Sequence, residues 1–282
     1  MALLQGWLHA RLSPEARAWL DDQIARIAAA RGQGPALAMA IGLAPRKLGK
    51  ADLCLDAADI AAGAALRPGL DASGWSVDQA ARILFMLASF DGDDAAFAAC
   101  FDKSLVSGEV GEHIALLRGL PLYPGAKSVL SRALEGVRSA VQPVFEAVAH
   151  ANPYPAEEFN EAQWNQMVLK ALFIGSRLGP IQGLDKRRNQ DLAQMLIDYA
   201  HERWAAGRSV SPELWRCVGP FARDSDLADL AKVLRTGDDI EQKAAALALS
   251  ESKLPGAAAL LETAPALAAA IEQREITWQD VV

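Results

Sequence analysis

The sequence has few cysteines and few aromatic residues. It contains three cysteines in 282 residues, and only 6% of its residues are aromatic. The cysteines, Cys54, Cys100 and Cys217, lie far apart, and no two of them have a CxxC spacing. An odd, scattered set is typical of reduced thiols packed in the core of a cytosolic protein. We therefore expect no disulfide framework and a cytoplasmic location.

Long apolar runs are also missing. The longest uncharged run, residues 32–45, contains glycines and prolines. It is shorter than the ~18 apolar residues that a membrane-spanning helix needs. Near the start, no basic segment precedes the apolar residues, and His9 and Arg11 interrupt them. We therefore expect neither a signal peptide nor direct insertion into a membrane.

The chain has no excess of positive charge. Its 28 Lys and Arg residues are outnumbered by 35 Asp and Glu residues, for a net charge of −7. Charges of both signs are interspersed, without a long run of either. Nucleic acids and anionic lipids need clustered Lys and Arg, so we expect neither as the main partner.

The residues that favour strands are scarce beside alanine and leucine. Helix signals recur instead. Ser13 followed by Pro14 is typical of a helix start, and Gly32 of a helix end. Ser76 and Gln79 have the spacing of a capping box. No segment combines β-branched alternation with hairpin turns, so we expect almost no strand.

The helix signals continue towards the C-terminus. Pro143 predicts a break, Asn189 a helix start and Gly207 a helix end. Short amphipathic segments joined by Gly or Asp turns then follow one another, as in HEAT repeats, although no clean period runs through the chain. One of these segments begins with a capping box, Asp238 and Glu241. We predict an all-α fold, a helical bundle or α-solenoid with HEAT-like helical hairpins, strongest in the C-terminal part.

Boundaries between domains are only weakly marked. The loosest connectors are residues 67–75 and residues 177–189, which are rich in glycine and polar residues. We expect a single all-helical domain over residues 1–282. A subdivision into a helical bundle, residues 1–180, and a HEAT-like array, residues 181–282, is the alternative.

The most unusual segment is HANPYPAEEFNEAQWNQMVLKALF, residues 150–173. Pro153 and Pro155 each disfavour a helical conformation at the preceding residue, so Asn152 and Tyr154 are expected to be extended. The segment therefore predicts a stiff corner between two helices. Corner-making alone explains much of its composition.

The same corner offers candidates for binding a ligand. They are Asn152, Tyr154, Trp164, Asn165 and His201. The corner explains Asn165 least, because a buried asparagine must find hydrogen-bond partners. Those partners are either a ligand or polar groups of a neighbouring helix, and both alternatives stay open.

Motifs for common chemistries are incomplete. His201 begins a sequence like that of a zinc-protease helix, but Ala205 stands where the second histidine must be. Around Lys50, a sequence like a phosphate-binding loop has Ala44 in place of its first glycine and Ala51 in place of the hydroxyl residue. We therefore predict no catalytic residue, no metal ligand and no cofactor.

Several long phrases resemble the EboA family. They are LLRGLPLYPGAK, SRALEGVRS, VFEAVAHANPYPAEEFNEAQWNQMVLKALF and GLDKRRNQDLAQMLIDYAHERWAAGRSVSPELWRCVGPF. The resemblance is strong over residues 116–221, looser in the HEAT-like tail and only general in the first third. It implies a place in a conserved bacterial and algal operon, the ebo operon, that makes or moves a secondary metabolite. The family has no assigned catalytic residues, so none is carried over.

The resemblance implies a role in that pathway. We expect a non-catalytic scaffold or adaptor, because helical arrays present long faces to protein partners. Its partners would be other ebo operon products, including the membrane prenyltransferase-like protein, and a small metabolite. One alternative is a small-molecule carrier with a pocket near the Asn152–Pro155 corner, and another is an unrecognised enzyme that uses carboxylates and His201. A closed pocket would favour the carrier, and an inward-facing carboxylate with a raised pKa the enzyme.

Overall fold

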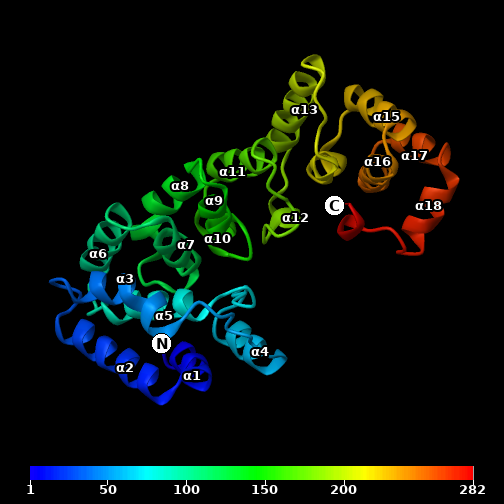
Figure 1. The fold of residues 1–282 in the computed structure, drawn as a ribbon. Helices are drawn as coiled ribbons and strands as arrows, with labels where there is room; N and C mark the ends of the chain where they lie inside the picture. Colours follow the sequence, from blue (N-terminus) through cyan, green and yellow to red (C-terminus); the bar gives the residue numbers. More distant parts are fainter. Residues whose placement is uncertain (282) are drawn as a thin grey trace. The chain divides into compact units, whose positions relative to one another are not determined.

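The computed structural model describes residues 1–281, and these residues are helical from end to end (Figure 1). The structure is 71% helical, with 18 α-helices and no strands among the described residues. An isolated bridge joins Asp52 to Ser76. The predicted all-α class is confirmed, whereas the HEAT-like repeat stays a prediction.

The chain divides into two compact units, Met1–Asn160 and Glu161–Val282. The division lies before residue 180, where the sequence suggested one. The first unit holds ten α-helices and two short 3-10 helices. They are α1 (Ala2–Arg11), α2 (Pro14–Ala29), α3 (Ala36–Leu48), α4 (Ala57–Leu66), α5 (Val77–Ala88), α6 (Asp94–Val106), α7 (Val110–Arg118), η1 (Leu120–Leu122), η2 (Ala126–Val129), α8 (Leu130–Arg138), α9 (Gln142–Ala149) and α10 (Tyr154–Glu158).

Local signals set several of these helix boundaries. At the start of α2, the Ser13 hydroxyl accepts a hydrogen bond from the backbone N–H of Ala16, and Pro14 takes the first helical position. Beyond the end of α2, Gly32 adopts a φ of 69°, which a glycine tolerates best. Pro143 lies in the first turn of α9, so the predicted break separates α8 from α9.

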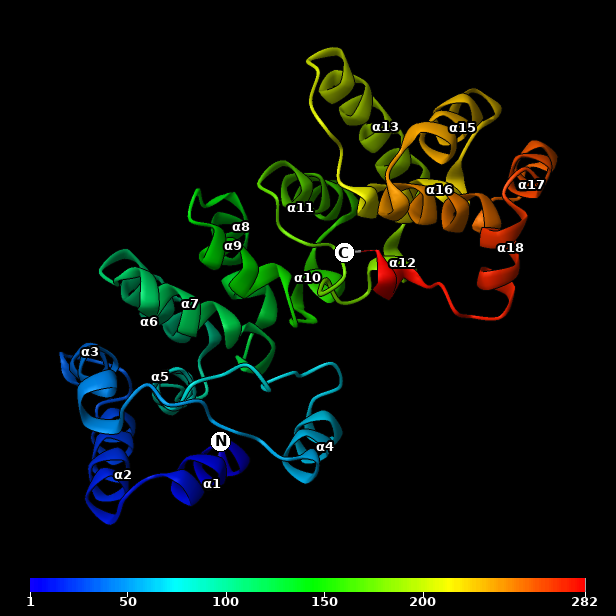
Figure 2. The ribbon, with the colours of Figure 1, turned by 45° about the vertical axis from the view of Figure 1, so that its right-hand side comes forward.

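Helix α5 is the central element of the first unit. It packs against α1, α2, α3 and α7, and Figure 2 shows it in the middle of this group. Its sequence, VDQAARILFMLA, is apolar on almost every side, which is typical of a buried helix. The two charged residues that it carries, Asp78 and Arg82, are therefore buried with it.

One local expectation was wrong. Tyr154, expected to be extended because Pro155 follows it, begins the short helix α10. A proline is tolerated in the first turn of a helix, because the N–H that it lacks would have no partner inside the helix. The change of direction comes earlier, at Ala151, whose φ is 49°.

The second unit holds eight α-helices and four 3-10 helices. In it, α15 packs on α16, and α16 packs on α17 and α18. The predicted helix starts at Asn189 and Asp238 are confirmed, each by a side chain that caps the backbone. The elements are α11 (Glu161–Phe173), α12 (Leu184–Arg187), α13 (Gln190–Ala205), η3 (Pro212–Leu214), α14 (Trp215–Val218), η4 (Gly219–Phe221), η5 (Asp224–Asp226), α15 (Leu227–Thr236), α16 (Asp239–Glu251), α17 (Pro255–Glu262), α18 (Pro265–Glu272) and η6 (Trp278–Asp280).

No helix among residues 1–281 combines the length and the apolar character that a helix needs to cross a membrane.

Candidate functional site

A pocket of about 700 Å³ opens in the first unit among α3, α5, α6 and α7. It is lined by charged, hydroxyl and amide side chains as well as small apolar ones, and no aromatic residue lines it. The lining residues are Ala38, Ile41, Gly42, Pro45, Lys50, Ser76, Asp78, Gln79, Arg82, Ser104, Ser107, Glu109, Gly111 and Glu112.

A buried ion pair forms part of this lining. Asp78 and Arg82 are four residues apart on α5, so their side chains lie on the same face of the helix. Arg82 Nη1 lies 2.9 Å from Asp78 Oδ2, and the two residues are 6% and 4% exposed. The Ser76 hydroxyl donates to the other oxygen, Asp78 Oδ1, at 2.6 Å. Both carboxylate oxygens of Asp78 are thus occupied.

Arg82 connects three helices through its guanidinium. Nε donates to the carbonyl of Ile41 on α3 at 3.1 Å, and Nη1 donates to the carbonyl of Gly111 on α7 at 3.3 Å. Nη2 donates to no other residue within the part of the chain that the structure describes. A buried guanidinium therefore keeps two N–H groups without a protein partner.

The free nitrogen of Arg82 borders open space. Among residues 1–281, the fully enclosed side-chain polar atoms that lack a partner are Trp7 Nε1, Tyr123 Oη and Trp164 Nε1. Arg82 Nη2 is not one of them, and Arg82 lines the pocket. Its two N–H groups are therefore available to a molecule inside the pocket.

The first turn of α7 brings carboxylates to the same pocket. Glu112 Oε2 accepts a hydrogen bond from the backbone N–H of Glu109, as in a capping box. Glu112 Oε1 has no hydrogen-bond partner in residues 1–281. A Cβ added to Gly42 would lie 3.6 Å from this oxygen, so Glu112 faces α3 across the pocket. With Lys50, the lining carries two cationic side chains and three carboxylates.

Two of the residues predicted from the sequence lie in the first unit, and both are buried. Asn152 Nδ2 donates to the carbonyls of Leu117 at 3.3 Å and Ala147 at 3.2 Å, and its Oδ1 accepts from the N–H of Tyr154 at 3.0 Å. The Tyr154 hydroxyl donates to the carbonyl of Ala126. Burial raises the pKa of this hydroxyl, so it stays protonated and able to donate.

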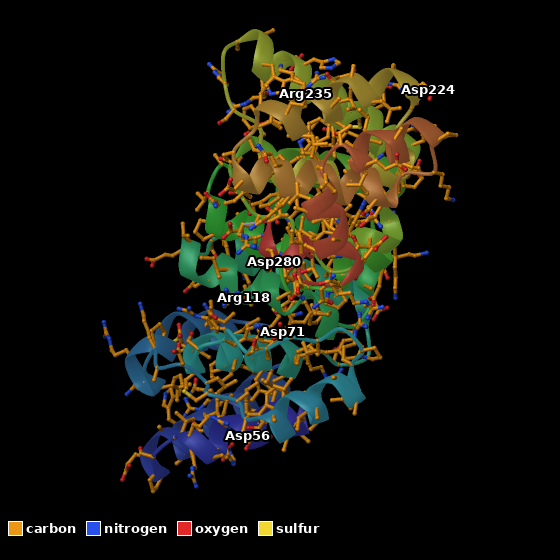
Figure 3. The ribbon with its side chains drawn as sticks, turned by 90° about the vertical axis from the view of Figure 1, so that its right-hand side faces the viewer. Asp56, Asp71, Arg118, Asp224, Arg235 and Asp280 are labelled. Atoms are coloured by element: carbon orange, nitrogen blue, oxygen red, sulfur yellow. The ribbon has the colours of Figure 1, made fainter. Side chains whose placement is uncertain are left out.

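A smaller pocket of about 210 Å³ reaches the predicted corner, and Asn152 contributes to its lining. Asp71 and Arg118 line it too, and Figure 3 shows them close together. Arg118 Nη1 donates to the carbonyl of Gly74 at 3.0 Å and to Gln79 Oε1 at 2.6 Å. Burial lowers the pKa of Arg118. Because Gln79 also lines the larger pocket, one hydrogen bond links the two linings.

The remaining predicted residues lie in the second unit. Trp164 is fully buried on α11, and the guanidinium of Arg187 lies 4.8 Å from the centre of its ring. Asn165 and Asn189 form a reciprocal amide pair, with Nδ2-to-Oδ1 distances of 3.1 and 2.9 Å. Asn165 thus has partners within the protein, on the N-cap of α13.

His201 lies further along α13, in a different environment. It is twelve residues beyond Asn189, which is about 18 Å along a helix. Its Nε2 lies 2.7 Å from Asp229 Oδ2 on α15, and its side chain is 53% exposed. The structure therefore separates His201 from Asn165 within the second unit. The ligand-binding role of the five predicted residues stays a prediction.

Sequence reasoning missed the pair Asp78 and Arg82, although a signal was present. Opposite charges four residues apart are common on exposed helices, where they stabilise little. Here they lie in a segment in which every other residue except Gln79 is apolar. Such a segment predicts burial, and buried charges need partners.

Over residues 1–281, no three His, Cys, Asp or Glu side chains come together in an arrangement that could hold a metal ion.

Comparison with known proteins supports one family. Neither a curated protein nor a solved structure matches the chain. A family model described as metabolite traffic protein EboA matches residues 1–219. The match includes the whole first third, where the sequence showed only a general likeness, and it covers every residue of both pockets described above. Because it spans well over half of the 282 residues, the chain belongs to the EboA family of metabolite traffic proteins.

Proposed function

We propose that the protein binds a small polar metabolite in the pocket among α3, α5, α6 and α7, and so acts as a carrier in metabolite traffic. The observation that carries this proposal is the unused Nη2 of Arg82, a residue that is only 6% exposed and that borders the pocket. In the open pocket these N–H groups can be hydrated, and a metabolite with acceptor atoms can take the place of that water without leaving them unpaired.

The size and the lining of the pocket support the same function. A volume of about 700 Å³ lies within the range of small-molecule sites. Most such sites are lined mainly by apolar and aromatic side chains, whereas this lining is rich in charged and polar groups, which suits a polar ligand. Ser76, Gln79 and Ser104 offer hydroxyl and amide groups beside the ion pair. We propose binding without a reaction, because both oxygens of Asp78 are held by hydrogen bonds from its neighbours.

A substitution that fills the pocket tests this function. Gly42 lies on α3 at the pocket, where an added Cβ meets only Glu112 Oε1, at 3.6 Å. Gly42→Leu should fill the pocket while favouring the helix, since glycine is a poor helix former. The matched control is Gly6→Leu on α1, where an added Cβ meets no atom within 4 Å.

Each variant would be exposed to a metabolite extract of the native host, purified again and weighed by native mass spectrometry. We expect a bound small molecule on the wild type and on Gly6→Leu, and its loss from Gly42→Leu with no fall in melting temperature. A wild-type protein that carries no molecule would contradict the proposal. So would a Gly42→Leu variant that carries as much as the wild type.

A scaffold or adaptor is the second candidate. It is supported by large apolar side chains that stay exposed, of which Phe173, at the end of α11, is 72% exposed. Exposed apolar residues can mark protein-binding surfaces. In this case tagged protein should recover other proteins encoded in the ebo operon from a lysate of the native host, with no enriched metabolite. Phe173→Ser should then lower that recovery, whereas Gly42→Leu should not.

A further inference from the structure

We propose that the pocket recognises a zwitterion, a molecule that carries a carboxylate and an amine close together, as a free amino acid does. This inference rests on the proposed function, because it names the chemical class of the molecule bound in that pocket. It follows from two unused groups of opposite charge, Arg82 Nη2 and Glu112 Oε1, that both line the pocket.

The guanidinium of Arg82 is suited to a carboxylate. Its position is fixed by the carbonyls of Ile41 and Gly111, so no further ordering is needed when an anion arrives. Its two free N–H groups can donate charge-assisted hydrogen bonds, which are stronger than neutral ones. The N-termini of α5 and α7 also lie at this pocket, and their helix dipoles add to the positive potential there.

Glu112 is suited to the amine. One carboxylate oxygen caps the backbone of Glu109, which holds the side chain in place, and the other is unused. That second oxygen lies near Gly42, the neighbour of Ile41, whose carbonyl binds Arg82. The donor and the acceptor are therefore both placed against the same turn of α3. A ligand with its two charges close together can reach both.

The charges of the lining disfavour the simpler ligands. A phosphate dianion would meet three carboxylates against two cationic side chains, Lys50 and Arg82. A ligand with only a positive charge would displace water from Arg82 Nη2 without supplying an acceptor, which costs free energy. A zwitterion satisfies both unused groups and leaves the net charge of the pocket unchanged.

The experiment compares each common amino acid with two derivatives that each lack one charge. The α-carboxamide has no carboxylate, and the N-acetyl derivative has no ammonium group. Binding to the purified protein is measured by thermal shift and titration. We expect at least one amino acid to bind. Both of its derivatives should bind at least about tenfold more weakly, since each loses a charge-assisted hydrogen bond.

Glu112→Gln tests the amine site without removing the helix cap, because a glutamine oxygen can still accept from the N–H of Glu109. It should weaken binding of the amino acid about tenfold. The matched control is Glu241→Gln, which changes the same capping position in α16, where Glu241 Oε2 accepts from Asp238 at 2.9 Å. The control should bind like the wild type.

Two outcomes would overturn this inference. One is a panel in which no amino acid binds better than both of its derivatives, and the other is a Glu112→Gln variant that binds as tightly as the wild type. Either would leave the proposed function standing if Gly42→Leu still loses the metabolite taken up from the extract. The failure of the ligand class and the failure of the pocket are thus distinguishable.

Discussion

Two buried charges, one in each unit of this chain, are held in different ways. In the first unit, Arg82 is 6% exposed and leaves one nitrogen of its guanidinium unused. In the second unit, Glu213 is 7% exposed, and both of its oxygens accept backbone hydrogen bonds, from Leu178 at 2.9 Å and from Gly179 at 2.8 Å. Equal burial therefore does not mean an equal role. A buried charged group whose hydrogen bonds are all satisfied supports the fold, whereas one with unused donors or acceptors can also bind a ligand.

The largest expected effect comes from breaking the ion pair of the first unit. Arg82→Leu leaves the Asp78 carboxylate buried without its cation, and we expect a loss of about 3–5 kcal/mol in the free energy of unfolding. The double variant Asp78→Leu/Arg82→Leu removes both charges and should recover most of that loss. Urea unfolding of the wild type, both single variants and the double variant measures this. A double variant no more stable than Arg82→Leu would contradict the expectation.

The next effect tests the satisfied charge of the second unit. Glu213→Ala removes the acceptor of two backbone N–H groups, and we expect a loss of about 3 kcal/mol, as for hydrogen bonds to a charged group. Metabolite binding in the first unit should not change. The control is Glu202→Ala, an exposed position on α13. If Glu213→Ala were as stable as that control, Glu213 would not support the fold as its contacts indicate.

A smaller effect is expected at Asn165. Asn165→Ala leaves the amide of Asn189 without its reciprocal partner, so stability should fall by ~1–3 kcal/mol. Thermal unfolding and the metabolite-binding assay are measured on the same sample. If Asn165 were instead a ligand-binding residue, the melting temperature would stay nearly unchanged and binding would be lost. The two results separate the alternatives that the sequence left open.

The smallest expected effect is on stability at low pH. Burial would raise the pKa of Asp226, but hydrogen bonds from Arg223 outweigh it and lower the pKa below its ordinary value of 3.8. A pKa that is lowered in the folded state stabilises the protein at pH values above the pKa of the unfolded state. That stability is lost as the pH falls through the pKa of the folded state. Asp226→Asn should therefore reduce the fall in melting temperature below about pH 4. Equal slopes of melting temperature against pH for the two proteins would contradict this.

Much of the fold was predictable because its signals are local. Ser13, Asn189 and Asp238 start helices through side chains that cap the backbone within three residues of themselves. The abundance of alanine and leucine predicted the all-α class in the same way. Tyr154 shows the limit of such rules. The residue before a proline usually avoids the helical conformation, but at a helix start that preference is weak enough to be overridden.

The candidate site was much less predictable. The spacing of Asp78 and Arg82 can be read from the sequence, but the same spacing occurs on exposed helices, where such a pair does little. The corner around Asn152 is more conspicuous in the sequence, because it is rich in prolines and amides. In the structure, the side chain of Asn152 is occupied by backbone groups of Leu117, Ala147 and Tyr154.

The sequence by itself determined the helices and their caps, because these depend on residues near one another in the chain, and it also identified the family. Tertiary structure alone decided which charges are buried and which of their hydrogen bonds stay unused. Arg82 has a spare nitrogen because Ile41 and Gly111, distant in sequence, take only part of its donors. A hydrogen bond left unmade depends on the positions of all neighbouring groups at once, and only the packed chain sets those positions.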